Sequence, residues 1–114
     1  MKFDPKDFSN APYVKSVEKP WGYELHFVPE DQPYMGKLLH IDAGKRLSLQ
    51  YHDQKTESWW LLTGQAKVIW DNANGALIET ELEAGKGYTT AKGQRHRLAG
   101  ITDCDIIELS LIHI

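Results

Sequence analysis

Four side chains that can bind a divalent metal ion occur in two separate parts of this sequence. Gln50 and His52 are two residues apart, so on a β-strand both point to the same face. Glu57 follows after a short polar run, and His96 comes later, just after a glycine. One amide oxygen, one carboxylate and two imidazoles suit a borderline divalent ion: zinc, manganese, iron, nickel or cobalt. The pattern predicts a site for one such ion, with one or two coordination positions left open for water or substrate.

Two predicted strands would bring three of these residues together. On a strand over residues 44–52, alternation predicts a polar face and an apolar face. The polar face would carry Arg46, Ser48, Gln50 and His52, and the apolar face Leu47, Leu49 and Tyr51. A second strand over 57–62 would place Trp59 on the same side as Glu57, where its ring could floor a sugar pocket. If these two strands pair, Gln50, His52 and Glu57 meet at one point.

The rest of the chain indicates an all-β domain. Turn signals occur every eight to twelve residues, and no helical periodicity of useful length is present, which favours an antiparallel sandwich or barrel. Further strands are predicted over residues 23–28, 34–42, 65–70, 77–82, 87–91, 94–99 and 105–112, with a hairpin loop over 71–75. At 114 residues the chain is one domain. We expect an irregular N-terminal arm over 1–18, and a barrel over 19–114.

The arm and the apolar face of the 44–52 strand both need cover. The arm carries Phe3, Phe8 and Tyr13, which must pack on the barrel exterior or on a second subunit. If the barrel interior holds the site, Leu47, Leu49 and Tyr51 lie outside and need a partner surface. These two features predict a homodimer, with cover from within the same chain as the alternative.

Composition and charge exclude several function classes. The net charge of −3, without a basic block, argues against nucleic acid and against an anionic membrane surface. No apolar run approaches the ~20 residues of a membrane span, and the first residues lack the apolar core of a signal peptide, so cytoplasmic residence is expected. The single cysteine, Cys104, excludes an internal disulfide and is expected to be a packing residue.

The spacing of the candidate ligands resembles the paired motifs of the cupin superfamily. The first motif, G-x5-H-x-H-x4-E-x6-G, corresponds here to Gly44, Gln50, His52, Glu57 and Gly64. The second, G-x5-P-x-G-x2-H-x3-N, corresponds to Gly85, Ala91, Gly93, His96 and Gly100. Gln50, Ala91 and Gly100 depart from the residues usual at those positions. The resemblance implies a single-domain cupin, a double-stranded antiparallel β-helix or jelly-roll barrel.

A narrower resemblance is to the cupin domain of type II phosphomannose isomerases. It rests on the string GKRLSLQYH with Glu57 and Trp59 after it, and on the element PWGYE that begins at Pro20. It implies a metal-dependent isomerase of a sugar or sugar phosphate that works through a metal-stabilised enediolate. Lys37 aligns with a lysine typical of that family, and Arg46 could meet a phosphate near the barrel mouth. Lys55 and Ser58 depart from the family pattern.

The sequence leaves the catalytic base and the exact activity open. His40 and His26 lie on strands beside the expected site and are candidate bases, and Glu24 and Glu108 could support the metal ligands. Two other functions fit the same motifs. One is a non-catalytic carbohydrate-binding or sensing cupin, and the other is an iron-dependent cupin dioxygenase. Gln50 in place of a histidine argues against the oxygenase.

Overall fold

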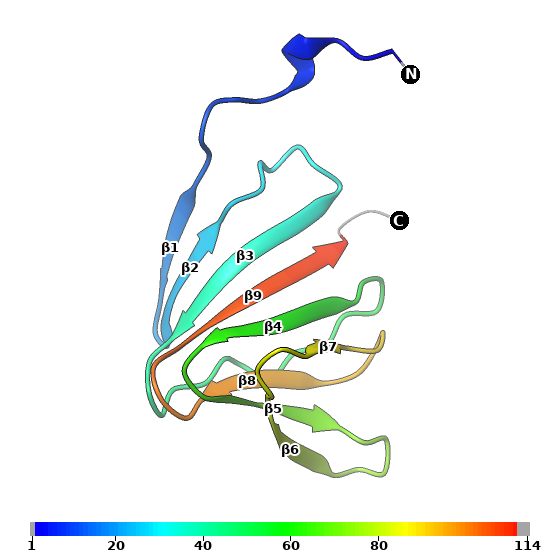
Figure 1. The fold of residues 1–114 in the computed structure, drawn as a ribbon. Helices are drawn as coiled ribbons and strands as arrows, with labels where there is room; N and C mark the ends of the chain where they lie inside the picture. Colours follow the sequence, from blue (N-terminus) through cyan, green and yellow to red (C-terminus); the bar gives the residue numbers. More distant parts are fainter. Residues whose placement is uncertain (1, 112–114) are drawn as a thin grey trace.

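The computed structural model of the chain describes residues 2–111, and almost all of its regular structure is β-strand (Figure 1). In chain order the elements are the 3₁₀ turn η1 (Pro5–Asp7), β1 (Lys15–Lys19), β2 (Gly22–His26), β3 (Tyr34–Ile41), β4 (Glu57–Thr63), β5 (Ala66–Asp71), β6 (Leu77–Glu81), β7 (Gly87–Thr89), β8 (His96–Gly100) and β9 (Cys104–Leu111). Within residues 2–111, no helix has the length and apolar character that crossing a membrane requires.

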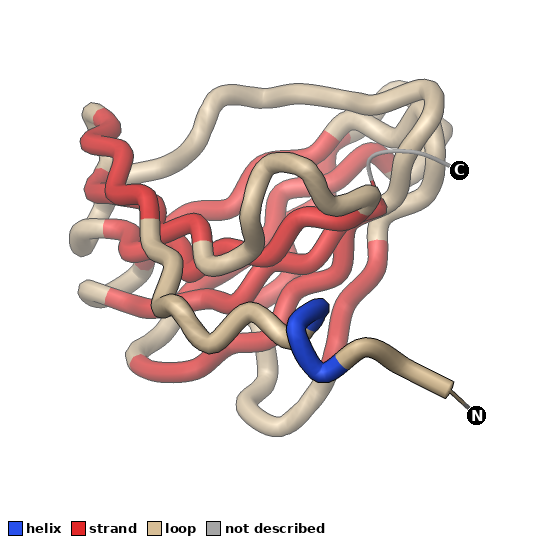
Figure 2. Tube along the Cα trace, turned by 90° about the horizontal axis from the view of Figure 1, so that it is seen from above, coloured by secondary structure: helices blue, strands red, loops and turns tan. Residues whose placement is uncertain are grey.

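The strands form two antiparallel sheets. The larger sheet has six strands in the order β1-β2-β3-β9-β4-β7, and the smaller has three in the order β6-β5-β8. The chain passes from the larger sheet to the smaller one between β4 and β5, visits the larger sheet again at β7, and returns to it finally between β8 and β9. Figures 1 and 2 together show that η1 lies beyond the strands, above them in the view of Figure 1. The expected all-β antiparallel architecture is confirmed.

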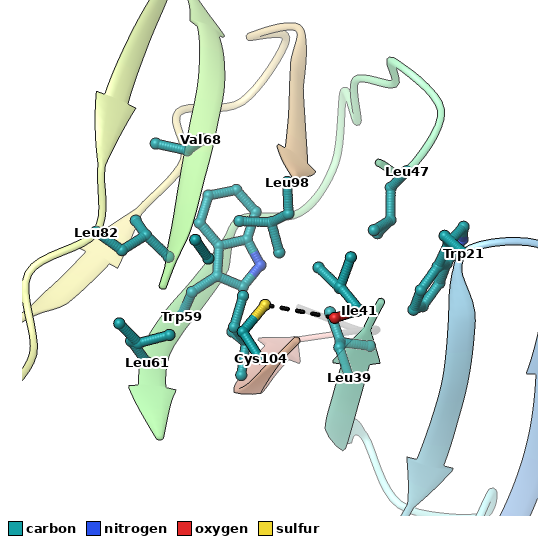
Figure 3. Close-up of a cluster of buried hydrophobic side chains, with 12 residues drawn as sticks. Trp21, Leu39, Ile41, Leu47, Trp59, Leu61, Val68, Leu82, Leu98 and Cys104 are labelled. Carbon is teal, nitrogen blue, oxygen red and sulfur yellow. Dashed lines mark hydrogen bonds between the residues drawn. The ribbon is translucent and has the colours of Figure 1, made fainter. Parts of the chain in front are cut away.

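Alternation along the strands explains which residues make the core. In β9, Cys104 and Ile106 are buried while their neighbours on the other face are more exposed, and β4 alternates in the same way. The buried cluster lies between the two sheets and includes Trp59, Leu98 and Ile106, together with Cys104 as expected (Figure 3). The Cys104 thiol lies 3.8 Å from the Ile41 carbonyl oxygen, and burial raises its pKa to about 11, so it is a packing residue.

The segment 44–52 differs most from the prediction. It forms no continuous strand, and it does not pair with β4. It lies instead beside β8, with isolated bridges Arg46↔Ala99 and Gln50↔His96. Because an interrupted ladder does not enforce strict alternation, Leu47 turns inward and is buried in the core. The prediction of an outward-facing Leu47 is therefore wrong, while Tyr51 is exposed.

Other boundaries agree with the sequence to within a few residues. The predicted loop 71–75 does connect β5 to β6, with Ala73 and Gly75 at positive φ. The last residues of the predicted arm, 15–18, belong to β1, which pairs with β2 at the edge of the larger sheet. Ile112, predicted to end the last strand, lies outside the described residues, as do Met1 and residues 113–114.

Candidate metal centre

Three of the four predicted ligands meet inside the barrel. One nitrogen each from His52 and His96 and one carboxylate oxygen of Glu57 all lie within 4.8 Å of one another. The His52 Nε2 is 3.0 Å from Glu57 Oε1, and the His96 Nε2 is 3.5 Å from Glu57 Oε2. Glu57 is the first residue of β4 and His96 the first of β8, so the two sheets contribute one ligand each at strand starts.

The Nε2 atoms of both histidines are open to a metal ion, and for His96 a hydrogen bond of the other ring nitrogen explains why. The His96 Nδ1 is 2.9 Å from the Gln94 carbonyl oxygen. Since a carbonyl only accepts, Nδ1 must carry the proton, and Nε2 keeps its lone pair. The Nε2 atoms of His52 and His96 are both buried without a hydrogen bond of acceptable geometry. Buried polar atoms are rarely left unsatisfied, and a metal ion between these atoms would satisfy both. The residues therefore fit a divalent ion.

Backbone pairing brings Gln50 to the same place. Its N–H donates to the His96 carbonyl oxygen at 3.0 Å, and the His96 N–H donates back to the Gln50 oxygen at 2.8 Å. The Gly93 N–H also donates to the His52 oxygen, which fixes the loop beside the start of β8. Gln50 lines the same cleft as His52 and Glu57. The expected pairing of residues 44–52 with the strand of Glu57 is wrong, because β8, not β4, is the pairing partner; the assignment of Gln50 as a ligand stays a prediction.

A second buried carboxyl group lies beside the cluster. Burial and the adjacent Glu57 charge raise the pKa of Glu108 to about 7. Burial opposes ionisation of Glu57 as well, but the proximity of His96, Glu108 and His52 lowers the pKa of Glu57 to about 2. Glu57 is thus the anion of the pair, which is the state that a metal ligand requires. The Glu108 Oε1 accepts a hydrogen bond from the Trp59 Nε1 at 2.9 Å.

The cluster opens into a polar cleft of about 260 Å³. Its lining is rich in ionisable groups: Lys19, Glu24, Lys37, Lys55, Glu57 and Glu108, together with Trp21, Leu39, Leu47, Ser48, Gln50 and His52. The Lys37 Nζ lies 3.4 Å from Glu24 Oε1, and the Lys55 Nζ lies 3.7 Å from Glu57 Oε1. The cleft thus presents cations within reach of an anionic or hydroxyl-rich ligand.

An aromatic cleft of about 310 Å³ lies on the other side of Trp59 and His96. Trp70 and Tyr88 contribute rings to it, and the Trp59 and His96 rings meet edge to face with centroids 5.4 Å apart. Trp59, predicted to floor a sugar pocket, is buried and lines this aromatic cleft. The sequence did not place Trp70 or Tyr88 at the site, because strand tryptophans are usually core residues.

Three other candidate residues lie away from the polar cleft. Arg46 is exposed and does not line it, because the neighbouring Leu47 takes the inward position. The His40 Nδ1 is 2.7 Å from Asp105 Oδ1, and this hydrogen bond raises the pKa of His40. The His26 Nε2 is 2.8 Å from Glu24 Oε1 and does not line the cleft. In the structure neither candidate base lies at the candidate metal ligands.

Comparisons with known proteins agree with this arrangement. The model of the family described as Mannose-6-phosphate isomerase C-terminal matches residues 6–114. A curated relative, mannose-1-phosphate guanylyltransferase 2 of Escherichia coli O157:H7, is 26% identical over 99 residues, which cover 84% of this chain. The aligned part is only 19% of the relative's own length.

Solved structures share the fold at low sequence identity. KdgF from Halomonas sp. matches with a TM-score of 0.68 and 14% identity, over 100% of this chain and 96% of its own. The oxalate decarboxylase of Lactobacillus farciminis matches with a TM-score of 0.75 and 17% identity, over 91% of this chain and 33% of its own. The capsular polysaccharide assembling protein CapF from Staphylococcus aureus gives 0.72 and 16%, over 97% and 33%. The cupin fold is therefore confirmed.

Proposed function

Because this chain belongs to the Mannose-6-phosphate isomerase C-terminal family, we propose that it is a divalent-metal-binding cupin that isomerises a sugar or sugar phosphate. The observation that carries the proposal is the convergence of two imidazoles with unsatisfied Nε2 atoms on one ionised, buried carboxylate. Gln50, His52, Glu57 and His96 would hold the ion. When bound, the ion would supply Lewis-acid polarisation of a sugar carbonyl and its neighbouring hydroxyl.

The residues around the cluster supply binding and orientation. Lys37 and Lys55 place two ammonium groups in the polar cleft, where they can bind the phosphate or hydroxyl groups of the substrate. The partly buried position of Lys37 makes its interaction stronger than that of a surface lysine, because water screens it less. Arg46, outside the cleft, is left as a candidate for contact with a substrate that extends beyond the mouth.

The aromatic cleft favours a second candidate function. Its rings suit the apolar face of a sugar, and His96 is its only lining side chain that titrates near neutral pH. Such a surface binds without performing chemistry. The alternative is therefore a non-catalytic carbohydrate-binding cupin that uses the same metal centre to orient its ligand.

Metal content and turnover together test the proposal. We expect elemental mass spectrometry of the purified chain, or of chelator-treated chain reloaded with zinc, manganese, iron, nickel or cobalt, to find about one ion per chain. The reloaded protein is then assayed for interconversion of mannose 6-phosphate and fructose 6-phosphate. Turnover would support the isomerase. Binding of mannose 6-phosphate without turnover would support the carbohydrate-binding alternative. A chain that takes up no ion under any of these conditions would contradict both.

Lys37 gives a prediction specific to the phosphate. We expect Lys37→Gln to weaken binding of mannose 6-phosphate roughly 10-fold, the loss of one charge-assisted hydrogen bond, and to change binding of unphosphorylated mannose much less. Calorimetric titration of both sugars measures the difference. Lys67→Gln is the matched control, because Lys67 pairs with Glu79 outside the polar cleft. Equal weakening for both sugars would contradict a phosphate contact at Lys37.

A further inference from the structure

The larger sheet has an apolar outer face that the described part of the chain leaves uncovered. Leu25, Leu38, Ile107 and Trp60 lie directly opposite one another on β2, β3, β9 and β4. Their neighbours along the strands, such as Leu39 and Ile106, are buried in the core, so this row points away from the barrel interior. We call the row, with the residues beside it that share its direction, the outer face. Its further members are Tyr23, Phe27, Tyr34, Ser58, Leu62, Leu109 and Leu111, with the hydrogen-bonded pair His40 and Asp105 at the end next to Thr63.

The outer face is poorer in polar residues than is usual for a solvated sheet. Antiparallel sheets with one face in water normally alternate apolar and polar residues, yet on β2, β3, β9 and β4 the charged side chains of this face are confined to the His40–Asp105 pair at one end. Trp60 is 46% exposed and Leu109 is 51% exposed. A groove of about 300 Å³ at one end of this face is lined by Tyr34, Leu109 and Leu111, among others. Contiguous exposed apolar surface of this kind marks an interaction site.

The N-terminal arm, residues 2–14, is a second apolar surface without cover. Every residue in it is exposed, and Phe3 and Phe8 are 79% and 76% exposed. The hydrogen bonds of these residues stay within the arm, at η1, and the first side-chain link to the rest of the described chain is Lys15 to Glu30 at β1. Figure 1 shows the arm leading away from both sheets. In an isolated protomer the two phenylalanine side chains would stay in water, and no burial of apolar surface would stabilise this short 3₁₀ turn.

The arm is long enough to reach across another molecule. Thirteen extended residues span about 45 Å, whereas the two shorter dimensions of the protomer are 28 and 26 Å. Two-fold symmetry would form each contact twice, once for each arm. Burial of a phenylalanine side chain is favourable by about 2 kcal/mol, and four such side chains would contribute. The arm and the outer face are therefore both apolar, and the arm is long enough to lie across the outer face of a second protomer.

We propose that the chain forms a symmetric homodimer in which the N-terminal arm of each protomer lies across the outer face of its partner. This surface is not the one that the sequence indicated, because Leu47 is buried within its own barrel. The proposal does not depend on metal binding or on turnover, since the polar cleft opens inside the barrel and the outer face lies on the opposite side of the sheet.

Sedimentation equilibrium with matched variants tests the dimer. We expect twice the 13.0 kDa protomer mass for wild type, and the protomer mass for Leu109→Asp and for the Phe3→Ser, Phe8→Ser double variant. Leu77→Asp is the control, because Leu77 is an exposed leucine of similar accessibility on β6 of the smaller sheet, and it should remain dimeric. Circular dichroism checks that each variant is folded. A monomeric wild type at about 100 µM would overturn the proposal.

Cross-linking between separate chains tests the arm exchange itself. Phe8→Cys and Leu109→Cys variants are made separately, mixed and oxidised; the native Cys104 is buried and should not react. We expect a disulfide between two different chains in the mixture. If the mixture gives no such product while the Phe8→Cys, Leu109→Cys double variant closes a disulfide within one chain, the arm covers its own barrel and the proposal is wrong. A dimer that persists after the arm substitutions would also overturn it.

Discussion

A Glu57→Gln variant is expected to bind zinc or manganese at least about 100-fold more weakly than the wild-type chain, because it loses the only charged ligand of the cluster. The Glu57 carboxylate faces both histidine Nε2 atoms, at 3.0 and 3.5 Å, and its pKa of about 2 keeps it ionised at neutral pH. Glutamine has nearly the same shape, so the backbone contacts of Glu57 with Thr90 should survive. A His52→Ala, His96→Ala double variant should retain no measurable metal.

Calorimetric titration of the chelator-treated proteins with each metal measures these changes. Glu24→Gln is the matched control: its carboxylate lines the same polar cleft but hydrogen-bonds His26 and lies near Lys37, outside the His/Glu/His cluster. It removes the same charge from the cleft and should change the metal affinity by less than about 10-fold. If Glu24→Gln and Glu57→Gln weaken binding equally, the effect is one of net charge in the cleft, and the proposed ligand set is wrong.

The sequence predicted that the candidate ligands His52, Glu57 and His96 lie close together, but it did not predict which strands pair around them. Gln50, His52, Glu57 and His96 could be grouped because glycines at motif positions and strand periodicity both depend on local backbone geometry. Glycine positions and strand periodicity also predicted most of the strands, with approximate bounds. The pairing partner of residues 44–52 is β8 because the chain changes sheets, and this topology is set by packing between distant segments.

Features that depend on the side-chain environment could not be read from residue order. Leu47 was assigned to the outside by alternation, but only isolated bridges hold its segment, and burial of an isobutyl group decides its direction. The rings that line the aromatic cleft come from four separate strands, β4, β5, β7 and β8, so no local pattern in the sequence records it. The outer face was likewise hidden, since Trp60 and Ile107 are far apart in the sequence and lie opposite each other only through the β4–β9 pairing.

A Gly64→Ala variant is expected to lose at least about 3 kcal/mol of unfolding free energy, and its melting temperature should fall by roughly 10 °C or more. Gly64 links β4 to β5, where the chain crosses between sheets, and its φ is +79°. Alanine in this left-handed region costs about 1 kcal/mol by itself. The added Cβ would also lie 2.1 Å from the Asp103 carbonyl oxygen and 2.9 Å from the Cys104 Cα, both backbone atoms that cannot rotate away.

Gly75→Ala separates these two causes. Gly75 has the same left-handed backbone, with φ of +80°, but a Cβ there would meet no atom within 4 Å. Its loss should therefore be only the conformational part, about 1 kcal/mol. Urea denaturation followed by tryptophan fluorescence gives both free energies. If the two variants differ by less than about 0.5 kcal/mol, the turn at Gly64 yields easily, and the close approach of the β4–β5 crossing to the start of β9 does not constrain the fold. If Gly64→Ala alone shows the large loss of unfolding free energy, the close approach of the β4–β5 crossing to the start of β9 is required for the stability of the fold that positions the candidate ligands.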